Sequence, residues 1–317
     1  MRTPGLIFVL FAHISVWVGA CFAEDVPPPS SDAHHYIEIP PGGMPSFLKW
    51  RSVRVPLVSH HRGGPAPGFP ENALETMQNA LLYGPGMMEV DVATLGDGTL
   101  VLMHDDTLDR TTTGAGALSS MTWDQVKTLY LRDESGKSTN FRIPRLVDAL
   151  RWAVGRAILT LDIKRGTDFE RVARLIAETG AGDYVIAISY SLEQAQSFAE
   201  TAPDLALSVT IRSLAELDAV KNSNLPQDRL IAWTGTRVQP QSLYDDIHAE
   251  GWKVILGTLG SPSTSLDAEF ARMGVPGRYL ELFQYGADVI ATDRFWAAQS
   301  EIYNPNLFFF IRQRIYE

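Results

Sequence analysis

The chain has 317 residues, of which 45% are hydrophobic, so it can bury a large core as one α/β barrel or as two average domains. A formal net charge of −10 and the lack of any basic run argue against a nucleic-acid partner. An acidic protein that acts on an anionic substrate needs a local positive centre, which a bound cation can supply.

The N-terminus has the pattern of an export signal. Arg2 precedes an apolar run over residues 6–22, and Ala23 suits cleavage, so we expect residues 1–23 to be removed. The run is too short and too early to predict a transmembrane span in the mature form. Cys21, the one cysteine, lies in a segment that loosely resembles a bacterial lipoprotein processing box, so a lipid anchor there is the alternative. Either way we expect an exported protein, periplasmic or secreted, without a disulfide.

Residues 24–50 are rich in proline, glycine and serine. This composition predicts a linker followed by a strap on the protein surface, and it favours a poorly ordered tail over a packed element. The folded barrel domain is therefore expected over residues 51–317.

Short apolar runs alternate with helical patterns along this domain. Amphipathic segments of helix length include residues 169–179, 192–202 and 243–251. Eight strands alternating with helices predict a TIM-type (β/α)8 barrel. An open doubly wound sheet would usually carry a glycine fingerprint after its first strand, and the sequence has none. The eight predicted strands are residues 54–60, 87–92, 157–163, 184–189, 205–210, 229–233, 252–256 and 287–291.

Two excursions exceed the eightfold pattern. The turn signal Asp97-Gly98 predicts a hairpin over residues 93–104, whose return arm brings His104 toward the barrel mouth. A longer insertion after the second strand, about residues 113–144, is predicted to contain one helix at 122–131. Long excursions from compact folds are often functional, so this insertion is a candidate lid or specificity element.

Carboxylates occupy two of the predicted strands. Glu89 and Asp91 are two residues apart, as are Asp162 and Lys164, so each pair leaves one face of its strand. Acids inside a barrel are costly unless they are paired or bound to metal. Three carboxylates suit a hard divalent metal, Mg²⁺ or Ca²⁺; the alternative is that each acid pairs with Lys164 or an arginine.

Two histidines are candidates for proton transfer. His61 ends the first strand and His104 ends the hairpin, and imidazoles titrate near neutral pH. The sequence does not decide whether His60 or His61 faces the site. Arg62, followed by two glycines, offers a guanidinium fork for a phosphate.

A polar pair precedes the first helix after the first strand. Asn72, with Glu75 three residues later, matches a capping box, which by itself accounts for Asn72. Glu71 is a candidate to orient Arg62 or to face the metal.

These motifs, in this order, resemble the glycerophosphodiester phosphodiesterase family over residues 55–164, and more weakly to the final predicted strand. The resemblance implies a barrel hydrolase that uses a divalent cation to cleave small-molecule glycerophosphodiesters into sn-glycerol 3-phosphate and an alcohol. The motifs that carry it are His61-Arg62-Gly63, Pro70-Glu71-Asn72, Glu89-Val90-Asp91-Val92, Asp97-Gly98, His104-Asp105, Arg110-Thr111-Thr112 and Ile143-Pro144-Arg145-Leu146.

By matching positions, the resemblance implies that His61 and His104 form the acid/base pair. It makes Glu89, Asp91 and Asp162 the metal ligands, with Arg62 and Lys164 contacting the phosphate. The remaining site candidate, Glu71, is expected behind this set.

The sequence departs from the family pattern in places. The third acid, Asp162, is usually glutamate in the family, and residues 252–260 stand where a Trp-Thr-Val-Asn run is common. Two alternatives follow. One is a phospholipase D-like activity on lysophospholipids, with Tyr190, Trp233 and Trp252 lining an apolar mouth. The other is an exported phosphoester-binding protein that has lost catalysis.

Overall fold

The computed structural model describes residues 26–275 and 277–303. The predicted export signal over residues 1–23, with Cys21, lies outside the described residues. Within the described ranges, no helix is both long enough and apolar enough to cross a membrane.

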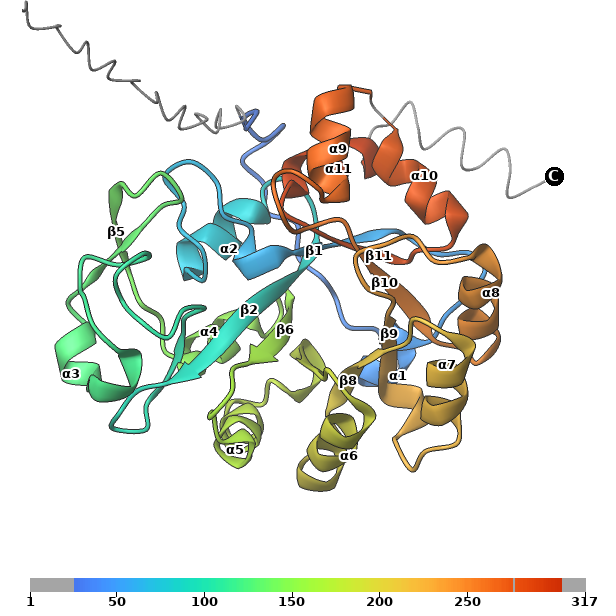
Figure 1. Cartoon of the computed structure of the whole chain (residues 1–317), viewed down its shortest axis with the longest axis horizontal. Helices are drawn as coiled ribbons and strands as arrows, with labels where there is room; N and C mark the ends of the chain where they lie inside the picture. Colours follow the sequence, from blue (N-terminus) through green and yellow to red (C-terminus); the bar gives the residue numbers. More distant parts are fainter. Residues whose placement is uncertain (1–25, 276, 304–317) are drawn as a thin grey trace, which may run out of the picture.

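Eight parallel strands close into a barrel (Figure 1). They are ordered β1-β11-β10-β9-β8-β7-β6-β2, and pairing of Val58 with Gly86 joins β2 back to β1. Each strand overlaps one of the eight that the sequence predicts, which confirms the TIM-type (β/α)8 barrel. The strands are β1 (Leu57–His60), β2 (Gly86–Thr94), β6 (Ile158–Ile163), β7 (Val185–Ile188), β8 (Ala206–Thr210), β9 (Leu230–Trp233), β10 (Lys253–Gly257) and β11 (Val289–Thr292).

Helices surround the barrel and bury one face each against the strands. In α5, Asp168 caps the first turn by accepting a hydrogen bond from the Glu170 N–H, and Gly180 ends the helix with φ 68°. Val172 and Ile176, four residues apart, form its buried stripe. The outer helices are α2 (Leu74–Ala80), α4 (Leu146–Ala153), α5 (Phe169–Thr179), α6 (Leu192–Thr201), α7 (Leu214–Lys221), α8 (Gln241–Ala249), α9 (Leu266–Met273), α10 (Arg278–Tyr285) and α11 (Phe295–Ile302).

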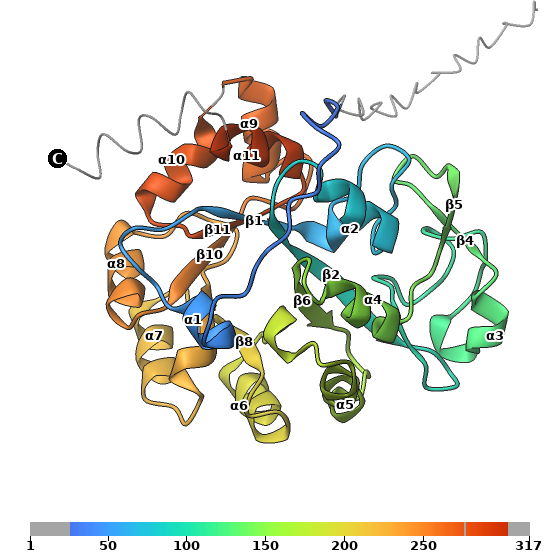
Figure 2. The same cartoon turned by 180° about the vertical axis from the view of Figure 1, so that it is seen from behind.

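The N-terminal ends of the strands are covered by a short helix, α1 (Gly43–Leu48) (Figure 2). Met44 and Leu48 are fully buried against the first core residues of the strands, such as Met87 and Ile158. The composition of residues 24–50 favoured a poorly ordered tail, and for α1 this expectation is wrong. Burial of its apolar side chains on the open end of the barrel outweighs the local preference for disorder.

The excursions after β2 differ in how well the sequence predicts them. The hairpin is confirmed, because β3 (Leu100–Leu102) pairs antiparallel with β2. In the insertion, the helix predicted over 122–131 is too long: α3 ends early, and the chain then forms an antiparallel hairpin. Leu131 is buried, and the residues on either side of it form backbone hydrogen bonds with Thr111 and Thr113. These tertiary hydrogen bonds override the helical pattern. These elements are α3 (Trp123–Val126), β4 (Tyr130–Arg132) and β5 (Ser138–Arg142).

Candidate active site

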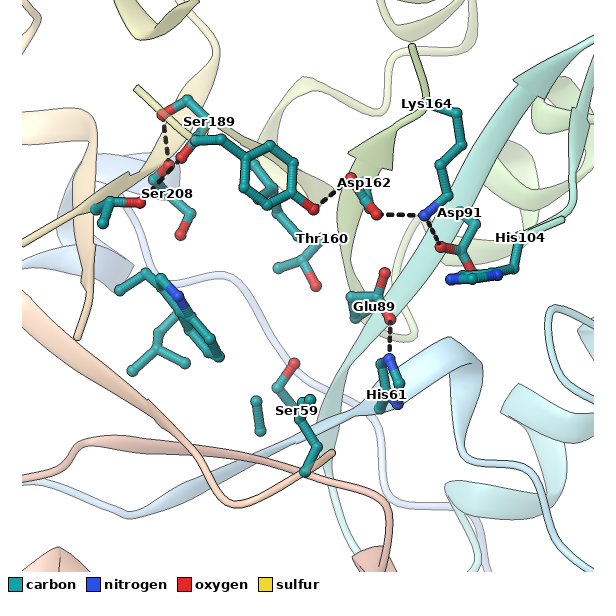
Figure 3. A pocket seen from close by; sticks show the side chains of 17 residues that line it. Ser59, His61, Glu89, Asp91, His104, Thr160, Asp162, Lys164, Ser189 and Ser208 are labelled. Carbon is teal, nitrogen blue, oxygen red and sulfur yellow. Dashed lines mark hydrogen bonds and ion pairs between the residues drawn. The ribbon is translucent and has the colours of Figure 1, made fainter. Parts of the chain in front are cut away.

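Three carboxylates meet toward the C-terminal ends of two neighbouring strands (Figure 3). Glu89 and Asp91 leave the same face of β2, and Asp91 lies in register beside Asp162 of β6. The structure therefore brings together the three acids that the sequence singles out, with one oxygen of each within 4.8 Å of the others.

Lys164 supplies the positive charge nearest to this cluster. Its Nζ lies 2.7 Å from Asp91 Oδ1 and 2.6 Å from Asp162 Oδ2. Burial lowers the pKa of Lys164, but the two carboxylates outweigh burial, so the pKa is raised and the ammonium stays charged. Burial and the Asp91 charge raise the pKa of Glu89 well above its usual range.

The raised pKa of Glu89 shows that negative charge on the three neighbouring carboxylates is unfavourable without further compensation. A divalent cation would supply that compensation. The ligand atoms are all oxygens, the donors that Mg²⁺ and Ca²⁺ prefer. On both charge and donor chemistry, the residues present fit such a cation.

Asn72 holds Asp91 by two hydrogen bonds. Its Nδ2 donates to Asp91 Oδ2 at 2.7 Å, and its Oδ1 accepts from the Asp91 N–H at 2.9 Å. The capping interpretation of Asn72 is therefore wrong: the N-cap of α2 is Ala73, and Asn72 has the left-handed φ of 59°. Asparagine tolerates that conformation better than most residues, which leaves its amide free to reach the strand.

The adjacent histidines point in opposite directions. His60 is buried, stacks on Phe295 at 5.0 Å, and has its pKa lowered to about 3 by burial. It is a core residue. His61 instead lines the pocket of the three carboxylates, and its Nε2 lies 4.0 Å from Glu89 Oε2.

A carboxylate that the sequence did not single out orients His61. Asp293, one residue after β11, accepts a hydrogen bond from His61 Nδ1 at 2.6 Å. Burial lowers the pKa of His61, but this bond and the charges of Glu89 and Asp293 raise it above its ordinary value. The signal in the sequence was an acid two residues after the last predicted strand, at the end of the weaker part of the family resemblance.

His104 is oriented in the same way by its neighbour. Asp105 Oδ1 accepts from His104 Nδ1 at 2.7 Å, and Asp105 also binds Arg110 through Nε at 2.7 Å. The Arg110 hydrogen bonds are the main cause that lowers the pKa of Asp105. Because both carboxylates are ionised acceptors, Nδ1 carries the proton in each histidine, and Nε2 remains for exchange with a ligand.

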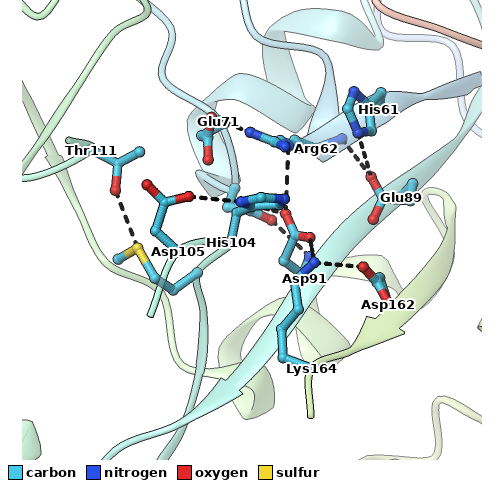
Figure 4. Close-up of polar contacts among 12 residues, drawn as sticks. His61, Arg62, Glu71, Glu89, Asp91, His104, Asp105, Thr111, Asp162 and Lys164 are labelled. Atoms are coloured by element: carbon cyan, nitrogen blue, oxygen red, sulfur yellow. Dashed lines mark hydrogen bonds and ion pairs between the residues drawn. The ribbon is translucent and has the colours of Figure 1, made fainter. Parts of the chain in front are cut away.

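Glu71 contacts Arg62 (Figure 4) and thereby links Arg62 to the hydrogen bonds of Asp105 and His104. Its Oε2 accepts hydrogen bonds from Arg62 Nη1 at 2.9 Å and from Arg110 Nη1 at 2.8 Å. Two roles were predicted for Glu71, and the contact that the structure shows is the one that orients Arg62. The Arg62 backbone, with φ 51°, directs its N–H to Glu89 Oε2 at 2.7 Å. Arg110 was part of a recognised motif, but its contacts depend on tertiary folding.

The pocket beside the carboxylates has a volume of about 350 Å³. Tyr190 donates its hydroxyl to Asp162 Oδ1 at 2.8 Å and, with Trp233, forms part of the wall, as the sequence suggested. Trp252 does not: it is buried beside Gln227 near the opposite end of the barrel. The rest of the wall mixes apolar side chains, such as Ile188 and Leu259, with the hydroxyl residues Ser59, Thr160, Ser189, Ser208 and Thr210.

Fold and site together define a TIM-type barrel with a carboxylate cluster suited to a hard cation and two oriented histidines beside it. The chain belongs to the glycerophosphoryl diester phosphodiesterase family, whose sequence profile matches residues 61–295.

Individual relatives agree with this assignment. Glycerophosphodiester phosphodiesterase of Caldanaerobacter subterraneus subsp. tengcongensis is 31% identical over 156 residues, which cover 47% of this chain and 64% of the relative. Glycerophosphodiester phosphodiesterase 1 of Mus musculus is 37% identical over 125 residues, 38% of this chain and 37% of the relative. The matches thus span less than two thirds of either relative. A crystal structure of a glycerophosphoryl diester phosphodiesterase from Parabacteroides distasonis has 31% identity and a TM-score of 0.75, covering 86% of this chain and 94% of that one.

The role of Asn72 can be tested with Asn72→Gly, which keeps the left-handed backbone conformation and removes the amide. Loss of the two bonds to buried Asp91 is expected to lower the free energy of unfolding by about 1–3 kcal/mol in urea titrations. Asn140→Ala, at an exposed position, should change it by less than about 0.5 kcal/mol. Equal small effects would show that Asn72 does not hold Asp91.

Proposed function

We propose that the protein hydrolyses glycerophosphodiesters to sn-glycerol 3-phosphate and an alcohol, and that it requires Mg²⁺ or Ca²⁺. The observation that carries this proposal is the convergence of Glu89, Asp91 and Asp162 beside His61 and His104. Membership of the family and the names of the relatives support the substrate class.

Glu89, Asp91 and Asp162 would hold the cation. When bound, it supplies positive charge that polarises the phosphoryl group. Lys164 and Arg62 are the protein's own cations at the cluster, and in this proposal they bind phosphoryl oxygens. Removing one such preorganised donor typically lowers kcat by roughly 10²–10³.

The two histidines would transfer the protons of the reaction. Each ring is fixed through Nδ1 by an ionised carboxylate, Asp293 for His61 and Asp105 for His104. One Nε2 takes the proton of the attacking oxygen, and the other gives a proton to the departing alcohol. The same pair serves attack by water and attack by a glycerol hydroxyl through a cyclic phosphate. A protein that only binds phosphoesters would need no such pair.

The acid/base assignment predicts that His61→Ala and His104→Ala each lower kcat for glycerophosphocholine by roughly 10²–10⁴, because each removes one proton-transfer step. The measurement is release of glycerol 3-phosphate by protein whose circular dichroism matches the wild type. His34→Ala, at an exposed position outside the pocket, should retain full activity. Near wild-type rates in either active-site variant would contradict the assignment.

The cation requirement predicts loss of activity on chelation and recovery when Mg²⁺ or Ca²⁺ is added back. Asp162→Asn removes one ligand charge, so about tenfold or more cation should be needed for half-maximal activity. Asp204→Asn changes an acid that is 97% exposed and should leave the cation requirement unchanged. Full turnover by metal-stripped protein would reject the requirement.

We further propose that the protein is exported. The charged and apolar N-terminal pattern supports this, since cleavage after Ala23 would release a chain that starts at Glu24. Mass spectrometry of the protein purified from its native host would give that N-terminus, or a lipid-modified Cys21 if the processing is of the lipoprotein type. An N-terminus that retains Met1 would contradict both.

A further inference from the structure

A second, wider cavity lies on the other side of His61 and Arg62. Its volume is about 600 Å³, and it opens between the turn that joins β4 to β5 and the helices α9 and α11. His61 lines both cavities, so a group bound at the carboxylates is next to the entrance of the second one.

The lining of the second cavity combines prolines and small residues with four acids, two arginines and one large aromatic ring, Trp296. Asp133 is engaged by the Gly68 N–H and by its own turn, and Asp293 binds His61. Glu134 differs, because it has no hydrogen-bond or ion-pair partner among the residues that the structure describes. Glu134 is an exposed residue of the turn between β4 and β5. Partial desolvation and the charge of Asp293 raise its pKa, so other negative charge lies close to it.

The guanidinium groups that also line the cavity are turned to other partners. Arg62 donates to Glu71 at 2.9 Å, and Arg294 donates to the Tyr279 hydroxyl at 3.3 Å. The unmatched group at the rim is therefore the Glu134 carboxylate. A carboxylate together with an indole ring is the usual combination for binding an organic ammonium group.

The two cavities match the two alcohols of a glycerophosphodiester. The inner one, with its Ser and Thr hydroxyls, suits glycerol, which is neutral and carries two hydroxyl groups. The second one is larger, more open to solvent and acidic, which suits a variable alcohol that bears a positive charge. His61 lines both cavities and so adjoins a group that would bridge them.

We propose that the second cavity holds the departing alcohol, and that Glu134 and Trp296 favour alcohols with a positively charged nitrogen, such as choline and ethanolamine. This inference rests on the proposed hydrolysis. The attacking oxygen bonds to phosphorus and gives its proton to His104, while the bond from phosphorus to the alcohol oxygen breaks. That oxygen takes a proton from His61 Nε2, and the alcohol leaves through the second cavity.

The test compares kcat/KM for glycerophosphocholine, a cationic alcohol, with that for glycerophosphoglycerol, a neutral one, on the full chain with cation present. Glu134→Gln is expected to lower the ratio of the two values by about 3- to 10-fold, and Glu134→Lys to lower it further. Trp296→Leu should lower the same ratio. Glu178→Gln, an exposed acid on the outer face of α5, should leave the ratio as in the wild type.

The outcomes separate this inference from the proposed function. Turnover of both diesters with a ratio that neither Glu134 variant changes would overturn the alcohol site and leave the hydrolysis intact. No turnover of either diester by the wild type with cation would overturn the hydrolysis, and the alcohol site with it. A ratio that falls in the order wild type, Glu134→Gln, Glu134→Lys supports the inference.

Discussion

Repulsion among three neighbouring carboxylates governs how the mouth of this barrel is built. Glu89, Asp91 and Asp162 lie within 4.8 Å of one another, and uncompensated buried charges cost several kcal/mol each. Each acid is therefore held by donors of the chain. Asn72 and Lys164 bind Asp91, Lys164 also binds Asp162 together with Tyr190, and the Arg62 N–H binds Glu89. These donors offset the repulsion among the three carboxylates only in part, and the raised pKa of Glu89 reflects the repulsion that remains.

The same requirement for compensation organises the layer around the cluster. Arg62 is turned to Glu71, Glu71 to Arg110, Arg110 to Asp105, and Asp105 to His104. Because every charge in this chain of contacts has a partner, His104 is fixed by the same network that fixes Arg62. Networks of this kind restrain side-chain geometry more than isolated pairs do. His61 is fixed independently, from the last strand, by Asp293.

The sequence predicted the site where local periodicity and strand register suffice. Glu89 and Asp91 had to share a face of their strand, and a parallel barrel aligns the ends of neighbouring strands, so Asp162 could be placed beside them. It failed where the deciding partner is distant in the chain. Asn72 matched a cap because the pattern of residues 72–75 is local, whereas its real partner, Asp91, is 19 residues away. Likewise Leu131 fits a helical pattern in the sequence but lies in a hairpin, because its neighbours form backbone hydrogen bonds with another part of the insertion.

The sequence by itself determined the barrel, the hairpin after the second strand and the set of acids and histidines at its mouth, because repeated apolar runs and two-residue spacing act over a few residues. The periodicity of the first strand did not distinguish His60 from His61; the family resemblance pointed to His61, and the tertiary structure places His61 in the pocket and stacks His60 on Phe295. It also decided that residues 43–48 close the barrel and that a second, acidic cavity adjoins His61. Such features arise from contacts between segments far apart in the chain, which no local pattern records.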